Sequence, residues 1–190
     1  LYGCDEVLTD QQVCKAEARM GVPEGGGMTG VIGMLHCGMG PTVALRFDID
    51  ALPVRECEEL DHFPAQEGFR SEHAGYMHAC GHDGHITVGL GTAKLLCQMR
   101  EQLHGTVKFI FQPAEEGVRG ARAIVENGHL EDVDFLLAAH MYGGSEQHPC
   151  GICITAGHGL ATTKLDVDFH GKASHAAAAD AVKAYLDAGQ

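Results

Sequence analysis

The sequence predicts an α/β fold, and three observations lead to that prediction. Short apolar segments that are partly β-branched are typical of buried strands, and they alternate with segments whose apolar residues recur at helical spacing. Polar clusters directly follow several of the apolar segments. Strands that alternate with helices favour a mixed, mostly parallel sheet that is flanked by helices on both faces.

Four apolar segments are expected to form buried strands, because each is short and apolar. They are residues 31–35 (VIGML), 43–47 (VALRF), 106–111 (TVKFIF) and 134–140 (DFLLAAH). Between the last two, residues 121–128 (ARAIVENG) suit a helix that ends at Gly128. Glycine is common at helix ends because it adopts the left-handed conformation without strain.

A long helix is expected over residues 86–103, before the third strand. Leu90, Ala93 and Leu96 fall on one face at helical spacing, together with Cys97, and no proline interrupts the segment. The helix would therefore pack this face against the sheet.

The pattern changes near the end of the chain. In residues 164–171 (KLDVDFHG), apolar and polar residues alternate, as in an antiparallel strand with one face in water. Residues 180–189 would form a short helix after it. We therefore expect a larger domain over residues 1–163 and the beginning of a small α+β domain over residues 164–190.

Composition and charge exclude several classes of partner. The chain has 190 residues, of which 45% are hydrophobic, and its formal net charge is −13 with only 13 Lys and Arg residues. No basic stripe is present to bind nucleic acid or an anionic membrane. No run approaches the roughly 18 apolar residues of a membrane span, and LYGCDEV does not resemble the start of a secretory signal. We expect a cytoplasmic protein.

The eight cysteines are scattered along the chain rather than arranged as a disulfide framework. Cys150 and Cys153 have the CxxC spacing of a thiol redox pair, but the sequence lacks the second CxxC of a four-sulfur zinc site. A redox function that depends on these two cysteines is the least favoured of the alternatives.

The segment GYMHACGHDGH carries the first candidate site. Cys80 and His82 are two residues apart, so both side chains can reach one ion from a single loop, and Gly81 leaves room for the backbone to bend. A turn that begins the helix, with Asp83 as its cap, explains the same residues equally well. His82 and His85 are three residues apart, which excludes the zincin motif.

Three further candidates lie downstream. Glu115 and Glu116 follow an apolar strand; an exposed pair of this kind is ordinarily solvated, but beside a cation one carboxylate could bind metal while the other takes a proton from water. His140 ends another strand and is either structural or a further ligand. His175 follows a glycine turn and is either a surface residue or a donor to a developing oxyanion.

Taken together, these residues resemble the amidohydrolase branch of the dinuclear metallopeptidase superfamily, which includes aminoacylases, carboxypeptidase G and plant auxin-conjugate hydrolases. The resemblance covers residues 30–177 through five motifs in the order ALRFDIDALPV, MHACGHDGH, FQPAEEGVRGA, AAHM and FHGKASHA. Within the family, the sequence most resembles the large subunit of the p-aminobenzoyl-glutamate hydrolase type. Five motifs in order are far more specific than any one of them.

The resemblance implies a role for each candidate residue. The implied metal ligands are Cys80, His82, Glu116 and His140. Glu115 would be the general base, and His175 would reach the active site of a neighbouring subunit from the lid domain. Asp48 and Asp50 stand where other branches carry ligands, so the resemblance implies a supporting role for them.

The resemblance also implies cofactors and partners. Two divalent ions, Mn²⁺ or Zn²⁺, would be bound, and the small lid domain would form a homodimer or heterodimer. Members of the family carry a further metal-binding histidine and a complete lid domain, neither of which this sequence contains. We therefore expect these residues to be an incomplete part of a longer chain.

The resemblance implies hydrolysis of the amide that joins an acyl or aroyl group to an amino acid, such as p-aminobenzoyl-glutamate. A related alternative is a general N-acyl-amino-acid or indoleacetyl-amino-acid hydrolase. An alternative of another class is a non-catalytic partner subunit that binds metal only for its structure.

Overall fold

The computed structural model describes residues 1, 3–9, 11–14, 29–59, 61–117, 119–141 and 151–152. The chain separates into two units, Leu1–Pro149 and Cys150–Gln190. Only Gly151 and Ile152 of the second unit are described, so the described fold belongs to the first unit. The predicted small domain over residues 164–190 lies outside the described residues.

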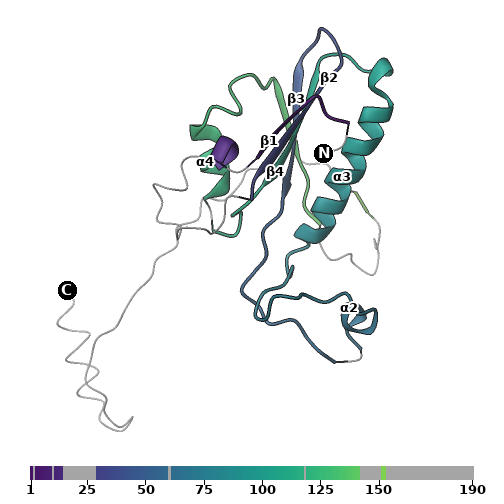
Figure 1. Cartoon of the computed structure of the whole chain (residues 1–190), viewed down its shortest axis with the longest axis vertical. Coiled ribbons are helices and arrows are strands. Elements are labelled where there is room, and N and C mark those ends of the chain that lie inside the picture. The colour runs from purple at the N-terminus through teal and green to yellow at the C-terminus, as the bar shows by residue number, and fades with distance from the viewer. Residues whose placement is uncertain are drawn as a thin grey trace, which may run out of the picture. The chain divides into compact units, whose positions relative to one another are not determined.

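A five-stranded mixed sheet forms the centre of the first unit (Figure 1). Its strands lie in the order β1-β2-β4-β3-β5. β2 pairs antiparallel with both β1 and β4, whereas β3 pairs parallel with both β4 and β5. The strands are β1 (Glu6–Thr9), β2 (Val31–His36), β3 (Thr42–Asp48), β4 (Thr106–Gln112) and β5 (Phe135–Ala138). The α/β class and the mixed sheet are confirmed, with parallel pairing confined to β4, β3 and β5 among the described strands.

Helices lie on both faces of this sheet, with α3 on one face and α1 and α4 on the other (Figure 1). The helices are α1 (Gln11–Cys14), α2 (Phe63–Gln66), α3 (His82–Gln98), the 3-10 turn η2 (Arg100–Gln102) and α4 (Gly120–Glu126). Ala93 of α3 packs with Phe109 of β4, and Ile124 of α4 packs with Ile110 of β4. Adjacent residues of β4 thus enter separate cores, because successive side chains of a strand point to opposite faces.

Three of the four predicted strands, 31–35, 43–47 and 106–111, are confirmed as β2, β3 and β4. The fourth forms β5, but the prediction that it is buried is wrong for the described structure. Leu136 is 53% exposed and Leu137 is 59% exposed. The physical reason is position: β5 lies at the edge of the sheet, and no described helix covers it.

The long helix was predicted to start at residue 86, but α3 begins four residues earlier, at His82. Its first turn is buried through His82 and His85 rather than through apolar residues, so an apolar period cannot detect it. Ala93 packs in the core as expected, whereas Leu90 is 50% exposed and does not belong to the packed face. Gly89 contacts the sheet instead.

The second predicted helix, 121–128, is confirmed as α4. Gly128 is left-handed, with φ of 77°, and its N–H donates to the carbonyl of Val125. The next N–H, that of His129, donates to the carbonyl of Ile124. These two hydrogen bonds form a Schellman motif, which explains why the helix ends where the sequence predicts.

Candidate metal centre

The candidate residues meet at one edge of the sheet. β3, β4 and β5 are parallel, so their carboxyl ends reach the same edge. Asp50 follows β3, Glu116 follows β4, and His140 follows β5. The amino-terminal end of α3 brings Cys80 and His82 to the same place. The polar clusters that follow the apolar segments in the sequence therefore meet at this edge, as far as the described residues show.

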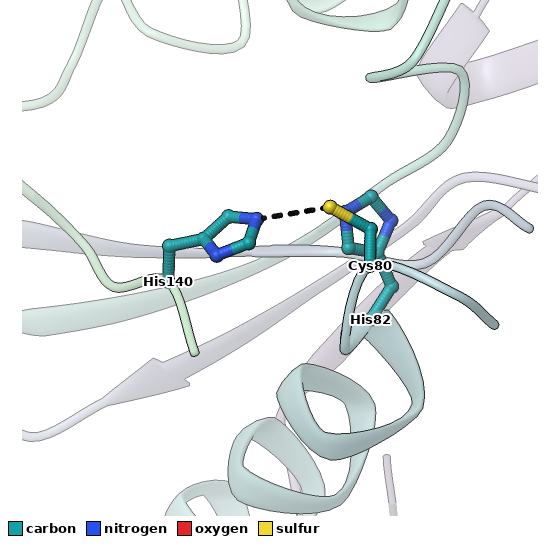
Figure 2. Close-up of side chains that lie close together, drawn as sticks. All are labelled: Cys80, His82 and His140. Carbon is teal, nitrogen blue, oxygen red and sulfur yellow. Dashed lines mark hydrogen bonds between the residues drawn. The ribbon is translucent and has the colours of Figure 1, made fainter. Parts of the chain in front are cut away.

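Cys80, His82 and His140 form one of the groups of potential ligands among the described residues (Figure 2). The Sγ atom of Cys80 lies 3.6 Å from Nε2 of His140, and one ligand atom from each of the three residues lies within 4.8 Å of the others. Gly81 connects Cys80 to His82 in the left-handed conformation, with φ of 83°. This conformation favours glycine, which explains the residue between the two ligands.

Hydrogen bonds to the backbone fix the orientation of two imidazoles. Nδ1 of His82 lies 2.9 Å from the carbonyl oxygen of Asp50, and Nδ1 of His140 lies 2.8 Å from the carbonyl oxygen of Met141. Because a carbonyl oxygen only accepts, each Nδ1 carries the hydrogen and each Nε2 carries a lone pair. This is the tautomer that binds metal through Nε2, with a backbone carbonyl as the outer partner.

The residues present fit a cation at this position. His82 is 1% exposed, and its Nε2 atom is buried without a hydrogen-bond partner. Carboxylate oxygens of Asp48 and Glu116 lie 3.7 and 3.9 Å from this Nε2 atom. A buried lone pair that faces carboxylates is costly unless a positive charge lies between them. A thiol, two imidazoles and a carboxylate also form a donor set that suits zinc and similar divalent metals.

Glu115 and Glu116 belong to the same cluster, since both have carboxylate oxygens close to His82. The N–H of Glu116 donates to Oδ2 of Asp50 at 3.0 Å. The preceding Ala114 is left-handed, with φ of 53°, a conformation that costs energy for a residue with a side chain. The turn that presents the two glutamates is therefore held in a strained conformation, partly by Asp50.

Burial and charge act on the Cys80 thiol. Burial raises its pKa, and a hydrogen bond with Glu116 and the negative charges of Glu116, Glu115 and Asp48 raise it further. Surroundings of this kind disfavour a thiolate. A bound divalent cation would reverse the balance, because it favours the deprotonated thiol that serves as its ligand.

His85 is a site residue that sequence reasoning missed. Its Nδ1 atom forms a hydrogen bond with the Oδ1 atom of Asp48, and its Nε2 atom accepts the N–H of Met141 at 2.8 Å. Asp48, His82 and His85 are also close enough to be considered as ligands, but both nitrogens of His85 are already engaged. The available signal was the helical spacing of His82 and His85, which places both on one face.

Asp48 is buried and ionised. Burial alone would raise its pKa, but the hydrogen bond with His85 and the charge of Arg46, whose Nη1 atom lies 2.9 Å from Oδ2, lower the pKa below its usual value. Asp50 contributes its carbonyl to His82 and its carboxylate to Glu116. Both aspartates therefore contact candidate ligands or their neighbours, and the supporting role that the resemblance implies for them stays a prediction.

Two predictions about this region have other outcomes. Asp83 does not cap α3: the cap residue is Gly81, which has no side chain to donate or accept, and Asp83 lies exposed in the first turn. A carboxylate there still interacts favourably with the helix dipole. His175, Cys150 and Cys153 lie outside the described residues, so their predicted roles stay predictions.

A family match, together with the fold and the site, identifies the class of protein to which this chain belongs. The model of the family described as peptidase family M20/M25/M40 matches residues 44–189. That match covers most of the chain, and it includes every candidate residue at the sheet edge. The chain belongs to the peptidase family M20/M25/M40.

Individual relatives are similar to parts of this chain. One p-aminobenzoyl-glutamate hydrolase subunit, from Escherichia coli (strain K12), is 48% identical over 155 residues, which are 80% of this chain and 35% of the relative. The indole-3-acetyl-aspartic acid hydrolase of Enterobacter agglomerans is 48% identical over 153 residues, 80% of this chain and 34% of the relative. The chain thus spans about a third of the length of these curated relatives.

A solved structure supports the same fold. The crystal structure of the Bacillus subtilis YXEP protein, described as a dinuclear metal binding peptidase from the M20 family, matches with a TM-score of 0.56 and 42% sequence identity. The match covers 71% of this chain and 32% of that structure. Among the described residues, no helix is both long enough and apolar enough to cross a membrane.

Proposed function

We propose that the intact protein is a metal-dependent amidohydrolase that cleaves the amide bond of an N-acyl or N-aroyl amino acid. The observation that carries this proposal is the meeting of Cys80, His82, Glu116 and His140 at one sheet edge, with Glu115 beside them. Membership of the M20/M25/M40 family supports it.

Two divalent ions, Mn²⁺ or Zn²⁺, would complete the site, with the first four of these residues as ligands. Such ions polarise an amide carbonyl and make water more acidic. The relative of known structure is described as dinuclear, which supports two ions rather than one. The chain's own contribution is to fix the ligand atoms: Asp50 and Met141 hold the two imidazoles so that each Nε2 faces the cluster.

Glu115 acts as the general base in this proposal. Its carboxylate takes a proton from the attacking water, whose oxygen forms a bond to the amide carbon. The bond from that carbon to nitrogen then breaks, and Glu115 returns the proton to the departing amine. His175 donates a hydrogen bond to the oxyanion that forms between these steps, and it comes from a lid domain that begins at residue 164.

We propose p-aminobenzoyl-glutamate as the first substrate to test, because the name of one relative, 48% identical, refers to that compound. An indoleacetyl-amino acid is the second, because another relative with 48% identity is named for indole-3-acetyl-aspartic acid. Two relatives are named as hydrolase subunits, which supports a further proposal that the lid domain forms a homodimer or heterodimer.

The experiment compares the intact protein with its Glu115→Gln variant, with both substrates and with bound metal measured in each sample. We expect the variant to keep its metal and lose about 10²–10⁴-fold in kcat, the usual contribution of a general base. Glu101→Gln is the matched control, because Glu101 lies exposed in η2, away from the cluster. A protein that binds metal but turns over neither substrate would favour the non-catalytic alternative.

A further inference from the structure

His85 links the end of β5 to the centre of the site. It is 3% exposed, and both of its ring nitrogens form hydrogen bonds, one with the carboxylate of Asp48 and one with the backbone N–H of Met141. Met141 directly follows His140, a proposed ligand, and its carbonyl oxygen accepts from Nδ1 of that histidine. The rings of His85 and His140 meet edge to face, with centroids 4.7 Å apart.

The hydrogen positions along this link follow from the partners. A backbone N–H only donates, so Nε2 of His85 is the acceptor and its hydrogen is on Nδ1. The hydrogen on Nδ1 then points at Asp48, which is ionised and completely buried. Asp48 thus selects the tautomer of His85, and His85 in turn holds the backbone N–H of Met141, the residue whose carbonyl oxygen orients His140.

The pairing of β5 with β3 ends at Ala138, two residues before His140. All four residues of β5 are exposed, so the strand contributes few apolar contacts that would fix the segment after it. The side chain of Met141 lies over Gly84 and Gly81, where an added Cβ at Gly84 would overlap its sulfur atom. The absence of side chains at these two glycines lets Met141 approach α3 closely enough to reach His85.

We propose that His85 is a positioning residue that places His140 for metal binding by holding the backbone N–H of Met141. The inference rests on the proposed function, because it takes His140 as a ligand. His85 itself contacts neither the metal nor the substrate in this proposal. Its effect should therefore appear in how the metal is bound, even when no substrate is present.

Two substitutions of His85 test its two hydrogen bonds one at a time. The amide of His85→Gln reaches as far as Nε2 of the imidazole, so it can still accept the N–H of Met141. The shorter amide of His85→Asn reaches only as far as Nδ1, so it keeps Asp48 and loses Met141. His36→Gln is the control, because His36 is an exposed histidine that pairs with Thr106, at the opposite end of β4 from the site.

The test is titration of each intact, metal-free protein with Co²⁺. Absorption spectroscopy monitors the binding, and thermal unfolding measures the stability of each variant. We expect His85→Asn to weaken Co²⁺ binding about 10–100-fold, as is typical for loss of an outer hydrogen-bond partner. Its thiolate-to-cobalt band should persist, because Cys80 is unchanged, while the ligand-field bands change. His85→Gln should restore most of the affinity and the parental spectrum.

Equal affinities in both variants and the parent, or equal losses in both variants, would overturn the inference and leave the proposed function standing. A parent protein that binds Co²⁺ without a thiolate band would overturn both.

A second measurement needs no substitution, so it applies even if a variant does not fold. Nitrogen NMR of the imidazoles should place the His85 hydrogen on Nδ1, and a hydrogen on Nε2 would contradict the inference.

Discussion

At the scale of single residues, the site depends on which atoms face inward. His140 is 60 residues from Cys80 in the sequence, and the ligand atoms of Cys80, His82 and His140 still come within 4.8 Å of one another. The resemblance to a known family implied these residues as ligands, whereas the local patterns alone left a structural alternative open for each of them. The sequence analysis did not predict His85, because it started the helix at residue 86 and so did not use the helical spacing between His82 and His85.

A substitution at Cys80 tests the sulfur ligand. Loss of an outer hydrogen-bond partner typically weakens metal binding about 10–100-fold. We expect Cys80→Ser to weaken zinc binding by more than this, because a hydroxyl is a poor zinc ligand. The measurement is competition with a chelator, with metal content followed by emission spectroscopy. Cys97→Ser is the control, since Cys97 lies in the apolar core at the other end of α3. Equal affinity in both variants would remove Cys80 from the ligand set.

At the scale of elements, α3 shows how a helix can serve both the fold and the site. Its later part packs through Ala93 and Leu96, which the sequence predicted from apolar spacing. Its first turn carries His82 and His85, whose burial depends on partners supplied by β3 and the segment after β5. Those partners are distant in the sequence, and local patterns therefore placed the start of the helix too late.

The close approach of α3 to the sheet gives a prediction about stability. A Cβ at Gly89 would lie 2.7 Å from an atom of Phe111 and 2.9 Å from atoms of Phe47. We expect Gly89→Ala to lower the free energy of unfolding by about 1–3 kcal/mol, because these packed rings have to shift. Chemical denaturation measures the change.

Gly91 provides the matched control for Gly89. It lies two residues further along the same helix, and nothing is within 4 Å of the position that its Cβ would occupy. Gly91→Ala should raise the free energy of unfolding by about 0.5–1 kcal/mol, because alanine favours the helical conformation. A loss of stability at Gly91, or a gain at Gly89, would contradict the packing described for α3.

At the scale of the whole molecule, the strands in the described part of the mixed sheet differ in burial. The central strands pack against apolar cores, whereas the edge strand β5 does not. Both faces of β4 are covered, whereas Leu136 and Leu137 of β5 stay more than half exposed. The sequence predicted burial of β5 from its apolar residues alone, and only the strand order shows that it lies at the edge. Whether an apolar strand is buried depends on its neighbours in the sheet, which a local pattern does not reveal.

The ion pair between buried Lys108 and Asp132 makes the stability of the fold depend on pH. The Nζ atom of Lys108 in β4 donates to the carbonyl of His129 at 2.9 Å and to Asp132, and Lys108 is 4% exposed. The hydrogen bond and charge of Lys108 lower the pKa of Asp132. The ionised carboxylate therefore stabilises the fold above the pKa of an unfolded aspartate, about 4, and this contribution is lost as pH falls through the lower folded value.

We expect Asp132→Asn to reduce stability by about 1 kcal/mol near neutral pH, a modest effect because the Asp132 side chain is 58% exposed. The difference from the parent should shrink as pH falls below about 4, where the parent loses the same charge. Thermal unfolding across this pH range measures it. Asp61→Asn, an exposed position with the same change of charge, is the control. A difference that does not vary with pH would contradict this role for Asp132.

In the proposed site, a sulfur, two imidazoles and a carboxylate bind divalent metal at the carboxyl edge of β3, β4 and β5. Anomalous diffraction from crystals of the intact protein, grown with zinc and measured at the zinc absorption edge, tests it most directly. We expect a peak within bonding distance of Cys80 Sγ and of Nε2 of both His82 and His140. Well-ordered ligand side chains at this sheet edge without such a peak would contradict the proposed site. A zinc ion bound elsewhere, while these side chains contact only protein, would also contradict it.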